Sequence, residues 1–221
     1  MGILSTKKKR KTCKVLEVRR LTDSTAVLRF ERAGLEFEPG QYIRVGLDGD
    51  PEIRDYSVYS GSSVDYVEVL VRRVEDGLVS KQLCDVEVGE EVSIGGPYGH
   101  FKLIEGLRGK PLLFIATGTG ISPYHSFVQS YPELEYRLIH GTAKLDEAYE
   151  FDFYGENFFH CVSREDGGGF KGRVTEYLQT LDVPPETNAF LCGNCDMIYE
   201  AFDMLQDKGL PTAQIHTEVY F

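Results

Sequence analysis

The chain has 221 residues, a formal net charge of -11 and a pI near 5.0. This length allows one or two domains, and the negative charge argues against nucleic acid as the main partner, because phosphate binding needs a broad cationic surface. Hydrophobic residues make up 42% of the chain and charged residues 27%, which is ordinary globular composition. No run reaches the apolar length of a membrane span and no cleavable leader pattern opens the chain, so we expect a cytoplasmic protein without integral membrane association.

Basic residues crowd the beginning of the chain. This segment favours two interpretations: a solvated terminus, or a docking surface for an acidic partner. The cations are Lys7, Lys8, Lys9, Arg10, Lys11, Lys14, Arg19 and Arg20.

The first half of the chain shows the alternation of antiparallel strands. In "QYIRVGL", Ile43, Val45 and Leu47 alternate with other residues, which is the period of a half-buried strand. "YVEVLVRRV" repeats the pattern, with valines on one face and Glu68 and Arg72 on the other. "CKVLEVRRL", "TAVLRFER" and "EEVSIGG" add shorter runs between turn signals. Several short strands at this spacing predict a small antiparallel β-barrel.

The pattern changes near residue 110. "PLLFIAT" is a continuous apolar run, typical of a parallel strand covered on both faces, and "YRLIHGT", "FFHCVS" and "NAFLCG" are further strand candidates. Helices are expected to begin near Pro123, Leu145, Val174 and Asp196. This alternation predicts an α/β parallel-sheet domain. We therefore place a barrel domain at residues 1–108, with a basic segment at 1–14, and an α/β domain at 109–221.

A glycine turn follows the apolar strand. In "ATGTGISP", the amides around Gly118, Thr119 and Gly120 precede a helix and can receive a pyrophosphate at its positive end. Pro123 stands where a dinucleotide fingerprint usually has its third glycine. A tight structural turn explains the glycines about equally well.

The cysteines and histidines do not predict a metal site. Cys192 and Cys195 form a C-x-x-C, which raises dithiol redox chemistry as a rival interpretation, although no thioredoxin-like setting surrounds them. An odd number of cysteines in a chain of this length fits a reducing compartment. The remaining cysteines are Cys13, Cys84 and Cys161, and the scattered histidines, expected to be structural, are His100, His125, His140, His160 and His216.

The motifs taken together are more specific than any one of them. "RDYS", "DGLVSKQL", "GGPYGHF", "GTGISP", "VSRE", "GRV", "LCGNCDMI" and "EVYF", in this order, resemble the ferredoxin–NADP reductase family over nearly the whole chain. The resemblance implies a two-domain fold, in which an FAD-binding antiparallel β-barrel precedes a Rossmann-like NADP-binding α/β domain.

The resemblance also implies an FAD site around "RDYS". Arg54 is expected to pair with the FAD pyrophosphate, Tyr56 to stack on the isoalloxazine ring, and Ser57 to lie within hydrogen-bond reach of the flavin N5. Without the other motifs, a surface ion pair and a barrel plug would explain Arg54 and Tyr56. The other implied FAD contacts are Gly77, Leu78, Val79, Ser80, Thr119, Tyr220 and Phe221.

For NADP, the resemblance assigns the 2′-phosphate to Ser163, Arg164 and Arg173, although each arginine alone also fits solvated surface charge. Many bacterial relatives carry an arginine where this chain has Ala143, followed by Lys144, which weakens the expected NADPH preference. The complete implied NADP set is Gly118, Thr119, Gly120, Pro123, Ser163, Arg164, Arg173, Cys192, Gly193, Asp196 and Met197.

The resemblance implies a flavoenzyme that transfers electrons between NADPH and ferredoxin or flavodoxin, acting as a monomer. Its catalytic residues are expected to be Ser57, Cys192, Glu218 and Tyr220. Tyr220 is expected to cover the flavin face opposite Tyr56 and to move aside for nicotinamide. The alternatives are the reductase component of an oxygenase, a small-molecule or free-flavin reductase, and a non-enzymatic flavin electron-transfer subunit.

Overall fold

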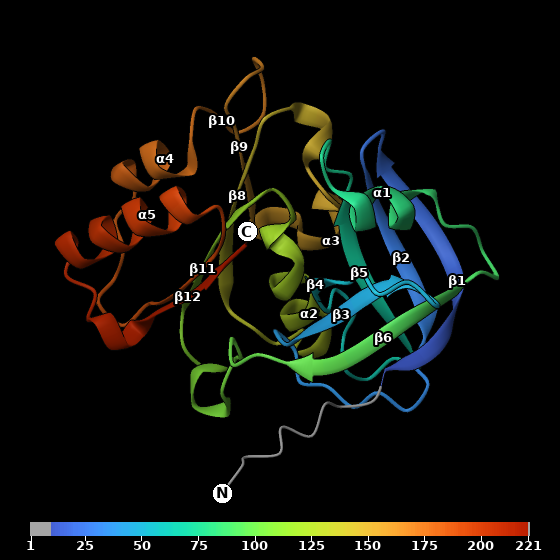
Figure 1. The fold of residues 1–221 in the computed structure, drawn as a ribbon. Helices are drawn as coiled ribbons and strands as arrows, with labels where there is room; N and C mark the ends of the chain where they lie inside the picture. Colours follow the sequence, from blue (N-terminus) through green and yellow to red (C-terminus); the bar gives the residue numbers. More distant parts are fainter. Residues whose placement is uncertain (1–9, 221) are drawn as a thin grey trace, which may run out of the picture.

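The structure, a computed structural model, describes residues 10–220 and contains two six-stranded sheets (Figure 1). Lys7, Lys8 and Lys9 of the basic run, and Phe221, lie outside the described residues. The first sheet is antiparallel and the second is parallel, so the two-domain prediction is confirmed. The exact boundary at residue 108 stays a prediction. No helix within residues 10–220 is long and apolar enough to cross a membrane.

The antiparallel sheet forms the barrel, with strand order β4-β3-β6-β1-β2-β5. An isolated bridge between Val58 and Val69 connects the end of β4 to β5, which joins the two edges of the sheet. Helix α1 (Leu78–Asp85) packs against β3 and β5. The strands are β1 (Lys11–Thr22), β2 (Thr25–Glu31), β3 (Tyr42–Leu47), β4 (Arg54–Ser57), β5 (Tyr66–Arg72) and β6 (Glu91–Tyr98).

Strand β5 differs from its prediction as a half-buried strand. Val67, Val69 and Val71 point into the barrel core as expected, but Glu68 and Leu70 on the opposite face are also buried. Leu70 belongs to a second apolar cluster shared with the α/β domain, so that domain covers the face predicted to be open. Alternation in the sequence reports which residues share a face, not what covers it.

The parallel sheet has the order β10-β9-β8-β7-β11-β12. In Figure 1, α4 and α5 cover its outer face, while α2 and α3 lie on the side toward the barrel. The strands are β7 (Leu112–Thr117), β8 (Tyr136–Thr142), β9 (Phe158–Val162), β10 (Phe170–Lys171), β11 (Asn188–Gly193) and β12 (Ile215–Val219). The helices are α2 (Ser122–Ser130), α3 (Phe151–Tyr154), α4 (Val174–Thr180) and α5 (Cys195–Asp207), with short 3₁₀ turns η1 (Glu105–Leu107), η2 (Gly118–Ile121), η3 (Leu145–Glu147), η4 (Gly155–Asn157) and η5 (Thr212–Gln214).

The helix expected near Leu145 is the clearest wrong prediction of secondary structure. Leu145 begins only a 3₁₀ turn, and the next helix, α3, is four residues long. Glu150 between them has φ of +49°, a left-handed conformation that no continuing α-helix contains. The other three helices begin at or within one residue of the predicted positions.

Strand β7 explains the continuous apolar run. Phe114 and Ala116 pack in the cluster facing the barrel, whereas Leu113 and Ile115 pack in the cluster under α4 and α5. Strand β7 lies between β8 and β11, where the strand order reverses. A reversal of this kind leaves a crevice at the carboxyl ends of the strands, which is where open α/β sheets bind ligands.

Candidate functional site

Three of the expected catalytic side chains form a hydrogen-bonded chain where the barrel meets the parallel sheet. The Tyr220 hydroxyl donates to Ser57 Oγ at 2.6 Å, and Ser57 Oγ donates to Glu218 Oε2 at 3.2 Å. Ser57 ends β4 of the barrel and is buried, while Glu218 lies on β12 of the α/β domain. The fold thus brings together residues that are 161 and 163 positions apart in the chain.

Glu218 has an unusual electrostatic setting for a glutamate. Burial raises the pKa of its carboxyl to about 7, and the hydrogen bond from Ser57 only partly opposes that shift. None of the ion pairs among residues 10–220 includes Glu218. A carboxyl with a pKa near neutrality can hold or release a proton under physiological conditions.

Glu218 also borders an open hollow of about 300 Å³, which gives its carboxyl a route to solvent. The other residues lining this hollow are His100, Phe101, Lys102, Phe190, His216 and Thr217.

Cys192, the fourth expected catalytic residue, lies against the same group. Its register partner across β11 and β12 is Glu218, and its thiol lies close enough to the Tyr220 hydroxyl for each group to shift the pKa of the other. Burial raises the pKa of the Cys192 thiol well above its ordinary value, so the thiol stays protonated. Because dithiol exchange requires a thiolate, this setting disfavours the C-x-x-C interpretation.

The glycine turn after β7 contacts the backbone at the end of β11. A Cβ atom at Gly120 would lie 2.4 Å from the carbonyl oxygen of Cys192, so only glycine fits there. The Asn194 amide donates to Thr117 Oγ1 at 2.9 Å, which ties the two turns together. Thr119 lies in this turn and Pro123 in the first turn of α2.

Helix α5 begins directly after the turn that follows β11. Asn194, which sequence reasoning missed, caps it by accepting a hydrogen bond from the Met197 amide at 3.2 Å. The side chain of Asp196 is exposed in the first turn of the helix, whereas Met197 is buried. The expected nucleotide residues of the turns after β7 and β11 therefore lie close together at the carboxyl edge of the sheet.

On the barrel, the expected flavin residues lie on β4 and at the start of α1. Arg54 is exposed, and its guanidinium contacts only Glu52 at 3.3 Å and the Ile53 carbonyl at 2.8 Å. Tyr56 packs against the barrel core, and burial raises the pKa of its hydroxyl. Arg54 lowers that pKa through its charge, so the two side chains are neighbours.

The start of α1 fits a phosphate group. Gly77 precedes the helix without a side-chain cap, which leaves the first amides of α1 without a side-chain partner. A Cβ at Gly77 would lie 2.5 Å from Ser80 Oγ, so glycine allows a close approach here. Ser80 itself accepts a bond from the Val74 amide at 3.1 Å and is buried, whereas Leu78 is exposed. The backbone of this turn is therefore a better candidate for phosphate contact than the Ser80 hydroxyl.

The three residues expected at a 2′-phosphate are exposed on the α/β domain. Hydrogen bonds hold the backbone of Ser163 and Arg164 to Thr142 and Ala143, each at 3.0 Å. Arg173 precedes α4, and its amide donates to Glu176 at 2.7 Å. Within the described residues, neither arginine side chain forms an ion pair, so both guanidinium groups are available to an anion.

Arg72 is a cation that sequence reasoning did not assign to the site. It ends β5 of the barrel, and its guanidinium lies 3.8 Å from the position of a Cβ atom at Gly118, beside the glycine turn. Glu147 of the α/β domain holds it at 3.1 Å. The alternation of "YVEVLVRR" placed Arg72 on the face opposite the valines, but nothing local indicated that the glycine turn meets that face.

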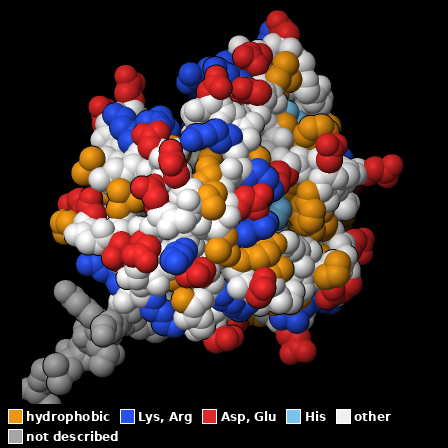
Figure 2. Space-filling model, turned by 90° about the vertical axis from the view of Figure 1, so that its right-hand side faces the viewer, with side chains coloured by type: hydrophobic (Ala, Val, Ile, Leu, Met, Phe, Trp, Pro, Cys, Tyr) orange, Lys and Arg blue, Asp and Glu red, His pale blue; other side chains and the backbone are white. Residues whose placement is uncertain are grey.

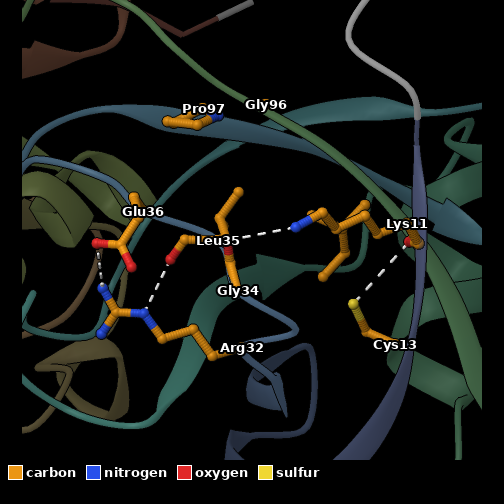
Figure 3. A pocket seen from close by; sticks show the side chains of 9 residues that line it. Lys11, Cys13, Arg32, Gly34, Leu35, Glu36, Gly96 and Pro97 are labelled. Carbon is orange, nitrogen blue, oxygen red and sulfur yellow. Dashed lines mark hydrogen bonds and ion pairs between the residues drawn. The ribbon is translucent and has the colours of Figure 1, made fainter.

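A separate hollow of about 100 Å³ on the barrel has a different character (Figure 3). Lys11 donates to the Ala33 carbonyl at 2.7 Å, and Arg32 donates to the Leu35 carbonyl at 2.8 Å. Its cations are thus already bonded to the backbone of the chain, in contrast to Arg164 and Arg173, whose side chains form no ion pair within residues 10–220. No group of three or more His, Cys, Asp or Glu side chains in residues 10–220 is arranged to hold a metal ion.

Comparisons with known proteins agree with this geometry. Residues 12–103 match the family model of the oxidoreductase FAD-binding domain. The toluate 1,2-dioxygenase electron transfer component of Pseudomonas putida is 30% identical to this chain. The alignment covers 93% of this chain and 66% of that relative. A ferredoxin–NADP reductase of Azotobacter vinelandii is 28% identical, with 89% of both chains aligned.

Solved structures show the same fold. The crystal structure of a ferredoxin NADP+ reductase from Neisseria gonorrhoeae, with bound FAD and NADP, matches with a TM-score of 0.87 at 24% identity. The match covers 96% of this chain and 99% of that one. Fold, FAD-binding domain and sequence relatives agree: the chain is a flavoprotein oxidoreductase that is similar to ferredoxin–NADP reductases and to oxygenase electron transfer components.

Proposed function

We propose that the chain is a flavoenzyme that transfers electrons between NADPH and a one-electron carrier, ferredoxin or flavodoxin. The observation that carries this proposal is the hydrogen-bonded group of Ser57, Glu218 and Tyr220, which lies between the FAD-binding barrel and the glycine turn. When bound, FAD exchanges a hydride with nicotinamide C4 at its N5 and passes single electrons to a carrier.

The barrel residues hold and orient the flavin. Arg54 has an exposed guanidinium with no partner from another element, which suits two pyrophosphate oxygens. The amides at the start of α1, from Leu78 onward, supply further donors. Tyr56 presents its ring beside the core, where it restricts the isoalloxazine to one orientation.

The residues between the domains control protons and access. Ser57 orients its hydroxyl between Tyr220 and Glu218, and the Glu218 carboxyl, whose pKa is about 7, holds a proton that it loses as the pH rises through this value. Tyr220 covers this site and moves aside when nicotinamide enters, so it acts as a gate. Cys192 stays a neutral thiol and fills the space beneath the gate.

The nucleotide binds at the carboxyl edge of the parallel sheet. The amides of the glycine turn are placed to receive its pyrophosphate, and Arg72 supplies a cation beside Gly118. The unpaired guanidinium groups of Arg164 and Arg173 suit the 2′-phosphate, which favours NADPH over NADH.

The identity of the carrier is open to a second candidate, a reductase that feeds an oxygenase. The electron transfer component from P. putida supports it, because it aligns with 93% of this chain. Surface charge does not designate a docking face on the side of the barrel shown in Figure 2, where acidic and basic side chains are intermingled. The Lys11 ammonium bonds to the Ala33 and Gly34 carbonyls, and Lys7, Lys8 and Lys9 lie outside the described residues.

Anaerobic absorbance spectroscopy tests the proposal. The purified protein, reconstituted with FAD, is mixed with NADPH and separately with NADH, and bleaching of the flavin band is followed. We expect rapid bleaching with NADPH and slower bleaching with NADH at equal concentration. A protein that retains no FAD, or whose FAD neither nucleotide reduces, contradicts the proposal. Reoxidation by ferredoxin, flavodoxin or free FMN then separates the carrier classes.

A further inference from the structure

Two carboxylates of the α/β domain form ion pairs with two arginines of the barrel. Glu147 Oε1 lies 3.1 Å from Arg72 of β5, and Glu150 Oε1 lies 2.6 Å from Arg19 of β1. The two glutamates are three residues apart: Glu147 ends η3, and Glu150 directly precedes α3. One short segment thus forms ion pairs with two different strands of the barrel.

Side chains around Glu150 strengthen this contact. The Tyr59 hydroxyl of the barrel donates to Glu150 Oε2 at 2.5 Å, and the Tyr149 and Thr25 hydroxyls lie 3.2 Å apart. His125 of α2 stacks on Tyr59 with ring centroids 3.8 Å apart, and burial lowers the pKa of this histidine to about 4. Because the histidine is neutral, Arg19 is the cation that balances Glu150.

The backbone of this segment has an unusual conformation. Glu150 has φ of +49°, a left-handed conformation that is uncommon for residues other than glycine, asparagine and aspartate. Such a conformation persists only where surrounding contacts hold it. Here the contacts come from Arg19 and Tyr59 of the other domain.

Glu147 connects the barrel to the nucleotide turn. Its side chain is buried, and its Oε2 accepts hydrogen bonds from the amides of Ala143 and Lys144 at 3.0 and 3.1 Å. Its other oxygen holds Arg72, whose guanidinium lies beside Gly118. One carboxylate therefore fixes both the turn after β8 and the cation at the glycine turn.

We propose that Glu147 and Glu150 form an interdomain clamp that sets the position of the α/β domain on the barrel, and that Glu147 positions Arg72 for the nucleotide. The inference rests on the proposed function. Interfaces between domains of one chain commonly permit relative motion, whereas hydride transfer tolerates little misplacement of its reactants. A clamp remote from the reacting atoms would limit motion between the domains and so keep the reactants in place.

Conservative amide substitutions test the clamp. In Glu147→Gln the amide oxygen can still accept the Ala143 and Lys144 hydrogen bonds, while the NH₂ group faces Arg72 and removes the ion pair. Asp146→Asn is the matched control, because it removes an exposed carboxylate from the same turn that has no ion pair in the described structure. We expect Glu147→Gln to lower kcat/KM for NADPH about tenfold to a hundredfold, mainly through KM, and Asp146→Asn to change it little.

A double-mutant cycle shows whether Glu147 acts through Arg72. If it does, Glu147→Gln has little further effect on NADPH affinity in the Arg72→Gln background. Equal losses in both backgrounds overturn the positioning role. Glu150→Gln is expected to lower the rate of flavin reduction more than it changes NADPH affinity, because it loosens the domains without touching Arg72. An unchanged rate overturns the part assigned to Glu150.

Hydrogen exchange supplies a readout that does not depend on turnover. Under conditions where all proteins are folded, Glu147→Gln and Glu150→Gln are expected to speed amide exchange in α2 and β5, which both contribute side chains to the apolar cluster shared by the two domains, while Asp146→Asn does not. Unchanged exchange in both variants refutes the clamp. If the wild type binds no nucleotide, the proposed function fails, and the exchange comparison still decides whether the clamp exists.

Discussion

Glutamates join the barrel to the α/β domain at two places, and their partners differ. Glu147 and Glu150 face arginines, at 3.1 and 2.6 Å. Glu218 forms no ion pair within residues 10–220; its carboxylate accepts a hydrogen bond from the Ser57 hydroxyl at 3.2 Å, and burial raises the pKa of this carboxyl to about 7. The same residue type therefore makes a fixed ion pair in one region and a group that gains and loses a proton in the other.

The arginines show the same division. Arg19 and Arg72 pair with carboxylates across the domain interface, whereas Arg54, Arg164 and Arg173 are exposed and, within residues 10–220, have no partner from the other domain. Paired cations hold the structure together, and unpaired cations are available to bind anions. Each prediction below tests one side of this division, from the largest expected effect to the smallest.

Glu218→Gln is expected to have the largest effect, because it removes a titrating group at the site. Turnover should fall about a hundredfold, which is typical for loss of a group that handles a proton. In the wild type, turnover should decline as the pH rises through about 7, where Glu218 loses its proton, and this dependence should vanish in the variant. Glu200→Gln, on the exposed face of α5, is the control. A variant that retains the full pH profile assigns the proton to another group.

Arg54→Ala tests the exposed cation of the barrel, which pairs only with its near neighbour Glu52 within residues 10–220. We expect FAD affinity to fall about tenfold to a hundredfold, the usual effect of losing charge-assisted hydrogen bonds to phosphate. The control is Arg44→Ala on the neighbouring strand, where the guanidinium already pairs with Asp55 at 3.1 Å. Fluorescence titration of the apoprotein with FAD measures the FAD affinity of both variants. Equal losses in the two variants would mean that Arg54 has no special role.

Replacing Arg164 and Arg173 together by alanine tests the unpaired cations of the α/β domain. The KM for NADPH should rise about tenfold or more, with little change for NADH, because only NADPH carries the 2′-phosphate. Arg137→Ala provides the control, since Arg137 is exposed on the same sheet and contacts only Tyr177 at 3.4 Å. Steady-state kinetics with both nucleotides measures the effect. Equal rises for NADPH and NADH would refute the assignment.

Two substitutions of Tyr220 distinguish its role as a gate from its hydrogen bond to Ser57. Tyr220→Ser should tighten NADP binding several-fold and shift the flavin spectrum, because the side chain no longer competes with nicotinamide. Tyr220→Phe keeps the ring but loses the 2.6 Å bond to Ser57, so NADP affinity should stay near that of the wild type. Difference spectra during NADP titration measure both the NADP affinity and the change in the flavin spectrum. Weaker binding in Tyr220→Ser with an unchanged spectrum would contradict the gate.

The smallest expected effect is on stability. In the folded protein Glu218 titrates near 7 instead of its ordinary 4.5, so between these values the folded state binds more protons than the unfolded state. This group therefore favours folding most below pH 4.5, and its contribution is lost as the pH rises toward 7. The difference in urea midpoint between Glu218→Gln and the wild type should grow over this interval, in favour of the variant. A constant difference would show that Glu218 is not the titrating group.

Much of the fold was predictable because strands and helices leave local patterns. Alternation identified β3 and β5, the unbroken apolar run identified β7, and Val174 marked the start of α4. The order of the motifs then named the residues of the site. The helix near Leu145 failed because its sequence shows no sign of the left-handed turn at Glu150, which contacts from the barrel hold in place.

The sequence by itself indicated the two domains and their order, because strands and helices leave short-range patterns, and its resemblance to a known family named the four candidate catalytic residues. Only the tertiary structure decided which glutamate has an arginine opposite it. Arg19 and Glu150 are 131 positions apart and Ser57 and Glu218 are 161 apart, so no local pattern reports either pairing. The protonation of a carboxyl depends on its neighbours in space and on its burial, and both are consequences of how the domains pack.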